Sequence, residues 1–177
     1  MKKSKLVDIA IFAMFGTIMF ISKLIMEFLP NVHPIAMFIT VFTLVYRKKA
    51  LIPIYVFVIL TGAYAGFNIW WMPYLYIWTV LWGFVMLIPK NLSLGKTAVL
   101  STVACALHGI LYGTLYAPFQ ALAFHLTFEA TLSWIAVGLP WDAVHMVGNI
   151  AMSTLVIPLY KVVSKLEEKR KIDKESF

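Results

Sequence analysis

Long apolar segments, each ended by a short polar or turn-forming stretch, fill almost the whole chain. A helix needs roughly 20 apolar residues to cross a hydrocarbon core of about 30 Å. Segments that reach or approach this length cover residues 6–29, 50–67, 70–88, 97–122 and 139–163, and a shorter one covers 34–46. The pattern predicts an all-α integral membrane protein with six transmembrane helices in a single domain, residues 1–177.

Two stretches at the edges of these segments need separate interpretation. The N-terminus begins like a secretory signal, but residues 6–29 contain no small-residue cleavage site, so we expect a retained first helix. The connection 120–138 is longer than a tight turn and moderately apolar. It is interpreted as an ordered outer connection that includes a short surface helix.

Composition supports lipid as the surrounding solvent. Hydrophobic residues make up 62% of the chain and charged residues 13%, with a mean hydropathy of +0.86. Soluble domains are nearer 45–50% apolar and about 25% charged. A small domain has too much surface for its size to hide such an excess from water.

The basic residues predict the orientation of the helices. All but one of the 15 Lys and Arg residues fall in the N-terminal segment, at 47–49, at 90–96 and in the C-terminal tail, the exception being Lys23. Basic residues collect on the cytoplasmic side of membrane proteins, so both termini are expected to be cytoplasmic. The net charge of +7 lies between apolar runs, which argues against a nucleic-acid partner.

Polar and aromatic residues recur at helical spacing in the last three segments. Spacings of three and four residues bring side chains to one helix face. The resulting stripes are Asp142, His145 and Asn149 on the last helix, His108, Tyr112 and Tyr116 on the fifth, and Trp71, Tyr74 and Trp78 on the fourth. Because polar groups are costly in lipid, the stripes predict an aromatic, hydrogen-bonding pocket open to the outside.

Structural roles compete with this interpretation. The aromatic residues at 70–76 would also suit an interfacial belt. His108 is equally suited to an interhelical hydrogen bond, and Asp142 to a cap at the start of its own helix. Lys23 and Glu27, one turn apart, are predicted to form a structural ion pair. The convergence of several stripes favours the pocket.

No catalytic machinery is recognisable. Gly95, Lys96 and Thr97 resemble the end of a phosphate-binding loop, but Lys90 stands where that motif requires glycine. Neither a nucleophile elbow nor a His-Glu-x-x-His zinc motif is present. We therefore predict no catalytic residues, no metal site and no cofactor in this chain.

Residues 138–149 contain the pattern Pro-x-Asp-x-x-His-x-x-x-Asn, which is similar to a segment that recurs in one family of membrane transport proteins. Residues 50–89 are also similar to that family. Together with six helices and cytoplasmic termini, the chain resembles the substrate-binding S component of energy-coupling factor vitamin transporters. The resemblance implies a multi-pass protein of a prokaryotic plasma membrane that captures a water-soluble vitamin at an outward-facing pocket. It also implies docking to a transmembrane T component and two cytoplasmic ATPase subunits, which hydrolyse the ATP.

Particular residues are predicted to carry these roles. From the stripes and the first outer loop, we predict pocket walls at Tyr74, Trp78, Tyr112, Tyr116, Asp142, His145 and Asn149, with His33 as a lid. Docking in the family uses an Ala-x-x-x-Ala face on the first helix, where small residues permit close approach. Here Ala10 is followed by Met14, so Ala10, Ala13 and Thr17 are the nearest equivalents.

The identity of the substrate stays open at this point. Pantothenate is favoured by overall resemblance, and Lys23 would bind its carboxylate. A substrate with several hydroxyl or amide groups would suit the Tyr, His and Asn residues equally well. Folate, riboflavin, cobalamin-like and queuosine-precursor substrates stay open as alternatives. The alternatives in function are a stand-alone secondary transporter or channel, which the missing internal repeat disfavours, and an intramembrane enzyme, for which no nucleophile–base pair is seen.

Overall fold

The structure is a computed structural model that describes residues 3–175, and no strand occurs among them. The elements are α1 (Lys3–Ile25), α2 (Ile35–Tyr46), the 3₁₀ turn η1 (Arg47–Ala50), α3 (Leu51–Ala65), α4 (Tyr74–Met86), α5 (Leu94–Ile110), α6 (Tyr112–Phe124), α7 (Phe128–Ser153) and α8 (Val156–Glu175). The predicted all-α class is confirmed for this part of the chain.

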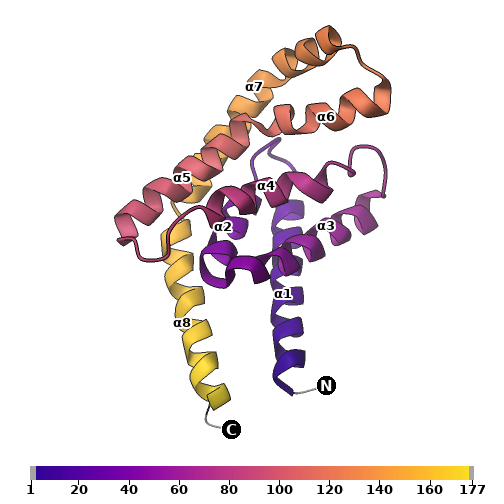
Figure 1. The fold of residues 1–177 in the computed structure, drawn as a ribbon. Helices are drawn as coiled ribbons and strands as arrows, with labels where there is room; N and C mark the ends of the chain where they lie inside the picture. The colour runs from indigo at the N-terminus through magenta and orange to yellow at the C-terminus, as the bar shows by residue number, and fades with distance from the viewer. Residues whose placement is uncertain (1–2, 176–177) are drawn as a thin grey trace.

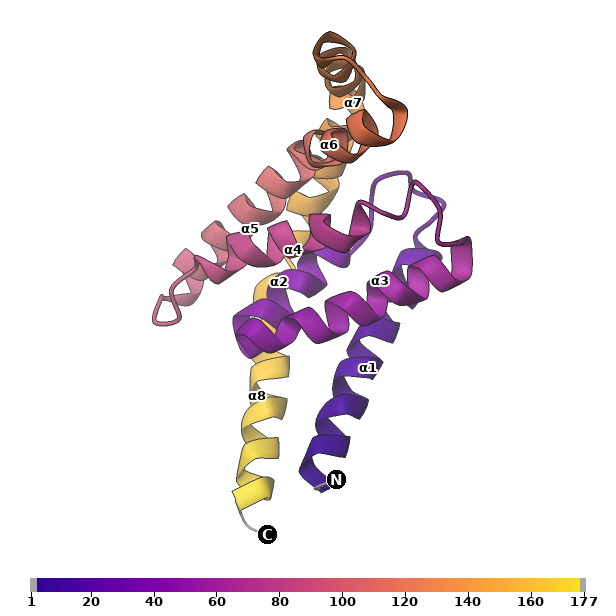
Figure 2. The same cartoon turned by 45° about the vertical axis from the view of Figure 1, so that its right-hand side comes forward.

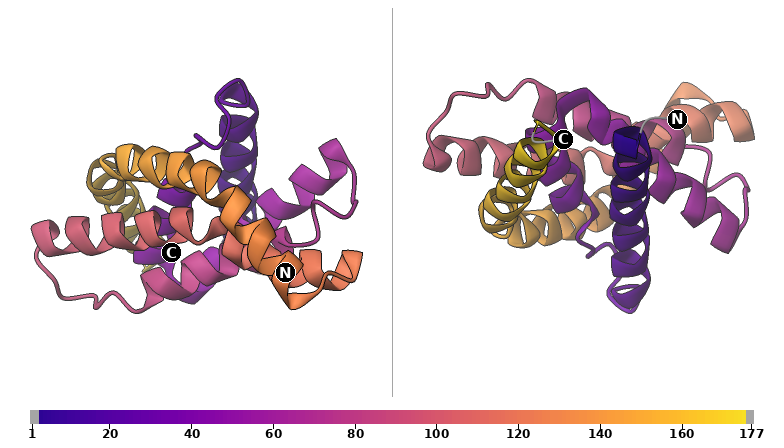
Figure 3. Two further views of the ribbon diagram at one scale, coloured as in Figure 1. Left: turned by 90° about the horizontal axis from the view of Figure 1, so that it is seen from above. Right: turned by 90° about the horizontal axis from the view of Figure 1, so that it is seen from below.

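The helices form a layered bundle with α2 near its centre (Figures 1 and 2). Helix α2 contacts α4, α7 and α8, while α5 packs along α7 and α1 along α3. The view from above shows α5 and α7 lying alongside each other (Figure 3). The free ends of α1 and α8 extend from the same end of the bundle, and α6 with the first half of α7 extends from the other.

The core is built around α2, most of whose residues are buried. Ile35 and Ile39 are fully buried against the neighbouring helices. The buried hydroxyls of Thr40 and Thr43 donate to the carbonyls of Ala36 and Ile39, at 2.8 and 2.6 Å. Local bonding of this kind satisfies the hydroxyls inside an apolar core.

Helix length limits how many membrane crossings the fold itself supports. Residues Leu6–Ile25 and Leu94–Phe124 are long and apolar enough to cross, and α7 with α8, bent by 51°, provides a third span if counted as one. Helices α2, α3 and α4 have 12, 15 and 13 residues, or about 18–22 Å at 1.5 Å per residue. The structure thus supports a membrane protein with two or three such spans, and the six-helix topology stays a prediction.

Several helix boundaries differ from those predicted. The segment 97–122 is interrupted at Leu111, between α5 and α6, and the segment 139–163 is interrupted at residues 154–155, between α7 and α8. The helix that contains residue 139 begins at Phe128, capped by Thr127. The connection 120–138 is therefore made of the end of α6, a short turn and the first part of α7, instead of a separate surface helix. Pro140 lies inside α7. The Gly-Leu-Pro sequence at 138–140 suggested a break, but continued helix keeps the backbone hydrogen-bonded in apolar surroundings.

An ion-pair cluster joins the free ends of α1 and α8. The guanidinium of Arg170 donates to both carboxylate oxygens of Glu167, at 2.8 and 2.6 Å, and to the carboxylate of Asp8 on α1. The three side chains are partly exposed. The cluster therefore aligns the two helix ends more than it stabilises the fold, because exposed ion pairs contribute little free energy.

Gly16 provides a test of the α1–α3 packing. A Cβ atom at Gly16 would lie 2.5 Å from Val56 Cγ1 and 2.8 Å from the carbonyl oxygen of Pro53, whereas a Cβ at Gly83 would meet nothing within 4 Å. We expect Gly16→Ala to reduce the free energy of unfolding by about 1–3 kcal/mol through overpacking. Gly83→Ala, the control, should leave it unchanged or raise it by up to about 1 kcal/mol. Thermal unfolding of both variants in detergent measures the difference; equal unfolding temperatures would contradict the packing.

Candidate ligand-binding site

A cavity of about 170 Å³ lies where the end of α1 and the following loop meet α4, α6 and α7. Its lining consists of Lys23, Met26, Glu27, Leu29, Pro30, Asn31, Val32, His33, Tyr74, Tyr112 and His145. Of the predicted pocket residues, the structure therefore brings together His33, Tyr74, Tyr112 and His145.

The loop between α1 and α2 closes one side of this cavity. Asn31 adopts a left-handed conformation with φ of 59°, and the amide of Leu29 donates to the carbonyl of Met26 at 2.9 Å. Val32 packs on α7 at Gly148, where an added Cβ would lie 3.3 Å from Val32 Cγ2. This seating holds His33, the predicted lid residue, against the helices.

Trp78 is the centre of an aromatic cluster beside the cavity. Its fully buried indole has ring-centroid distances of 5.4 Å to His108, 5.5 Å to Tyr74, and 5.9 Å to both Tyr112 and His33. Edge-to-face and tilted arrangements at these distances are favourable. Trp78 therefore supports the cavity wall from behind instead of lining it.

His145 occupies the junction of the cavity and the aromatic cluster. Its ring lies edge-on to Tyr112 at 4.6 Å, to His33 at 5.0 Å and to His108 at 6.3 Å between centroids. The side chain is buried, and neither ring nitrogen has a hydrogen-bond partner among the described residues. His145 thus brings two unused polar atoms to the cavity.

Unpartnered nitrogens recur throughout this group of rings. Besides both nitrogens of His145, the buried Nδ1 atoms of His33 and His108 and Nε1 of Trp78 lack partners in the described part of the chain. Most buried polar atoms in proteins are hydrogen-bonded, and each one left unpaired costs about 1–3 kcal/mol. Such a concentration on adjoining rings is typical of a site completed by a polar molecule.

The hydrogen bond of His108 fixes its tautomer. Its Nε2 lies 3.2 Å from the carbonyl oxygen of Ile77 on α4. A carbonyl oxygen can only accept, so Nε2 carries the proton and Nδ1 of the neutral ring is an acceptor. His108 therefore forms the interhelical hydrogen bond that was one of its two predicted roles, and also presents an acceptor to the ring cluster.

Formal charge at the cavity comes from Lys23 and Glu27. Burial, with smaller contributions from nearby His145 and Lys23, lowers the pKa of His33 to about 3, so His33 is neutral at physiological pH.

No ion pair joins Lys23 to Glu27 within residues 3–175, contrary to the prediction. Helix α1 ends at Ile25, so Glu27 no longer follows Lys23 by one regular turn. Both charges line the cavity.

Asp142 has a structural role outside the cavity. Both its carboxylate oxygens lie 3.0 Å from the amide nitrogen of Gly113, which donates from the first turn of α6. The interruption at Leu111 leaves first-turn amides of α6 without intrahelical partners. Asp142 is thus a cap, but for a different helix. The predicted cap of its own helix is wrong because α7 starts fourteen residues earlier, at Phe128.

Asn149 and Tyr116 also lie away from the cavity. The Nδ2 of Asn149 donates to the carbonyl of Cys105 at 3.0 Å and joins α7 to α5. The hydroxyl of Tyr116 donates to the carbonyl of Trp70, beside an open hollow that also includes Gln120. Spacing correctly predicted the shared face of Asn149, but the break at Leu111 divides the predicted stripe of the fifth helix, with His108 on α5 and Tyr116 on α6.

The predicted docking residues are exposed on α1. Ala10, Ala13 and Thr17 are all exposed, although Ala13 also borders an open hollow between α1 and α3. The hydroxyl of Thr17 donates to the carbonyl of Ala13 at 2.9 Å. Gly16 instead packs against Val56 of α3. The small-residue surface at Ala10, Ala13 and Thr17 is therefore left largely exposed by the packing of the described chain.

Sequence reasoning missed the cavity's loop side, residues 26–32. The available signals were the Pro30-Asn31 turn and the two charges just before it. No group of three or more His, Cys, Asp or Glu residues in the described part of the chain could hold a metal ion. Comparison with protein-family models, curated proteins and solved structures finds no match.

Removing the cap tests the structural role of Asp142. We expect Asp142→Ala to reduce the free energy of unfolding by about 1–2 kcal/mol, as loss of a helix cap does. Asp142→Asn keeps one acceptor oxygen, so its free energy of unfolding should lie between those of Asp142→Ala and the original chain. Thermal unfolding in detergent measures the order of stability. A fully stable Asp142→Ala protein would show that the α6 amide needs no cap.

Proposed function

We propose that this chain is the substrate-capture subunit of an energy-coupling factor importer. It crosses the membrane six times with both termini in the cytoplasm. It binds a small water-soluble vitamin in the cavity beside His145, and delivers it by docking to a shared transmembrane component with two ATPase subunits. The ligand-binding step involves no chemistry in this chain.

The cluster of unpartnered ring nitrogens carries the proposal. His33, Trp78, His108 and His145 come from a loop and three helices, yet their free nitrogens lie on adjoining rings. A core that served stability alone would fill these positions with apolar side chains, since each unpaired nitrogen is a cost. Of these four rings, His33 and His145 line the cavity, so a ligand that supplies hydrogen-bond donors and acceptors there removes that cost at these two rings.

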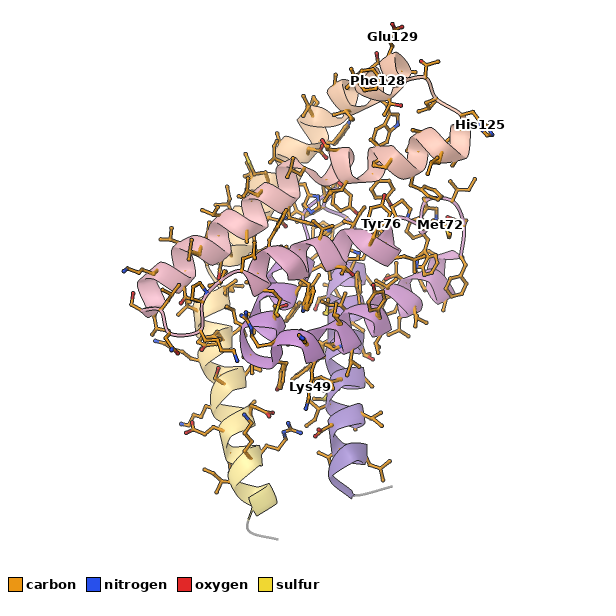
Figure 4. All side chains as sticks on the ribbon, in the orientation of Figure 1. Lys49, Met72, Tyr76, His125, Phe128 and Glu129 are labelled. Atoms are coloured by element: carbon orange, nitrogen blue, oxygen red, sulfur yellow. The ribbon has the colours of Figure 1, made fainter. Side chains whose placement is uncertain are left out.

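The distribution of charge supports the orientation. Helix α2 starts at Ile35, beside the cavity, and ends at Tyr46, immediately before the basic turn Arg47–Ala50. Its 12 residues span about 18 Å. Figure 4 shows Lys49 toward the end of the bundle from which α1 and α8 extend, and His125 and Glu129 at the opposite end. Basic residues at one end and the cavity away from them fit a cytoplasmic and an external side.

The cavity volume supports a lid. A cavity of about 150 Å³ in another protein holds one benzene molecule, so 170 Å³ accommodates a ring or a short chain. A complete vitamin is larger, so its binding requires the loop 26–33 to move outward. Pantothenate remains the favoured substrate, with its carboxylate near Lys23.

Ligand identification and titration test the capture function. Mass spectrometry of small molecules released from the purified, denatured protein names the ligand, and calorimetry then measures its affinity. We expect His145→Leu to weaken binding by about tenfold or more, because a hydrogen bond is lost. Exposed His125 at the far end provides the control variant His125→Leu, which should bind normally.

The same variant distinguishes a ligand contact from a structural role. Since His145 has no hydrogen bond to lose among the described residues, the ligand-free His145→Leu protein should unfold at the original temperature or above it. Lower stability together with unchanged affinity would contradict the proposal. Solute uptake by vesicles containing this chain alone would favour a stand-alone transporter instead.

Docking is tested separately from capture. Ala13→Trp places a bulky side chain on the exposed small-residue surface of α1, where close helix approach requires small residues. We expect vitamin uptake by cells that also produce the coupling subunits to be lost, while ligand affinity of the purified variant stays unchanged. Ile18→Trp, at an exposed position of α1 that helical spacing puts on a different side from Ala13, is the control. Uptake at the original rate by Ala13→Trp would exclude this docking face.

A further inference from the structure

A second cavity, of about 190 Å³, lies at the other end of α2 from the ring cluster. It is enclosed by the end of α2, the turn η1, the α4–α5 loop, the start of α5 and α8. Its polar lining is Arg47, Lys90, Thr97 and Tyr160, and its apolar lining includes Leu44 and Leu92. No acidic side chain among the described residues lines it.

Arg47 is held rigidly in the wall of this cavity. Its guanidinium donates to the carbonyls of Met86, at 2.6 Å, and Ile88, at 3.3 Å, at the C-terminal end of α4. The indole of Trp82 donates in turn to the carbonyl of Arg47 at 3.1 Å. A guanidinium has five N–H groups. The N–H groups of Arg47 that do not bond to these two carbonyls can therefore donate to a ligand from a cation whose position is already fixed.

Three further groups complete a positive environment. Lys90 adds a second cation, and the hydroxyl of Tyr160 has no hydrogen-bond partner among the described residues. Helix α5 begins at Leu94, with Ser93 as its cap and Thr97 in its first turn. The N-terminal end of a helix carries partial positive charge. A group bound here would meet two full cations and no opposing carboxylate of the described chain.

We propose that this cavity binds the phosphate group of an anionic phospholipid. Phosphate oxygens suit Arg as a fork-shaped donor and Lys as a point charge. The apolar side chains at Leu44 and Leu92 suit the glycerol and the first methylene groups of a lipid. Basic pockets between helices at the cytoplasmic surface are a known form of lipid recognition. The same phosphate chemistry also occurs in soluble phosphate esters, so the experiment has to separate the two sources.

Lipid retention in native mass spectrometry provides the test. The full chain is purified from detergent containing equal amounts of phosphatidylglycerol and phosphatidylcholine, and the bound lipids are counted. The double variant Lys90→Gln/Tyr160→Phe removes two ligand groups but leaves Arg47 to hold α4. The control, Lys96→Gln/Lys161→Gln, changes two neighbouring lysines that do not line the cavity.

We expect the original chain to retain phosphatidylglycerol preferentially. The affinity of the cavity variant for phosphatidylglycerol should be at least about fivefold lower. The control should retain it at more than half the original level, although it loses more charge. Glycerol 3-phosphate, added as a competitor of the bound lipid, identifies the source of the phosphate. Weak competition indicates the lipid. An affinity equal to that of the lipid indicates a soluble phosphate ester and overturns the lipid assignment.

Two outcomes would overturn the site itself. One is equal retention of both lipids by the original chain. The other is an equal loss in the cavity variant and the control, which would indicate diffuse attraction to a basic surface. Thermal unfolding of both variants without added lipid shows whether they fold. Neither substitution touches the ring cluster, so this result is independent of vitamin binding.

Discussion

Backbone amides and carbonyls in apolar surroundings must find partners inside the protein, and this constraint shapes two interruptions of the fold. Where α5 gives way to α6, the carboxylate of Asp142 accepts from the amide of Gly113. Where α4 ends, Arg47 donates to the free carbonyls of Met86 and Ile88. In each case a side chain from a distant segment supplies the hydrogen-bond partner that the backbone of the interrupted helix lacks. The hydrogen bond also fixes the two segments against each other.

Both cavities lie beside these interruptions, and the reason is geometric. A straight helix packs along its neighbours and leaves little space between them, whereas a helix that ends or turns leaves a gap beside its end. The ring cluster lies beside the break at Leu111, and the cavity with Arg47 lies beside the end of α4. Because the capping groups also brace the walls, each cavity has a rigid side. The loop side of the first cavity, residues 26–33, has no such cap.

Sequence patterns predicted what depends on a single segment and missed what depends on two. The apolar run 34–46 matches α2 closely, since hydrophobic length alone defines it. Asp142, His145 and Asn149 share a face of α7 as their spacing predicts, yet they meet α6, the ring cluster and α5 respectively. Pro140 suggested a helix start, but proline is tolerated inside a helix when surrounding packing compensates. Neither outcome is encoded in spacing.

The ring cluster also restricts how a ligand of the proposed kind is oriented. Ile77 fixes Nδ1 of His108 as an acceptor, so the group that meets it must donate. A carboxylate cannot donate, and burying it among neutral rings would be costly. The cation at Lys23, on the loop side of the cavity, is the favourable position for such a charge. An acidic vitamin of the proposed kind would therefore enter with its hydroxyl or amide groups toward His145, on the side of the cavity where His108 lies, and with its carboxylate near Lys23.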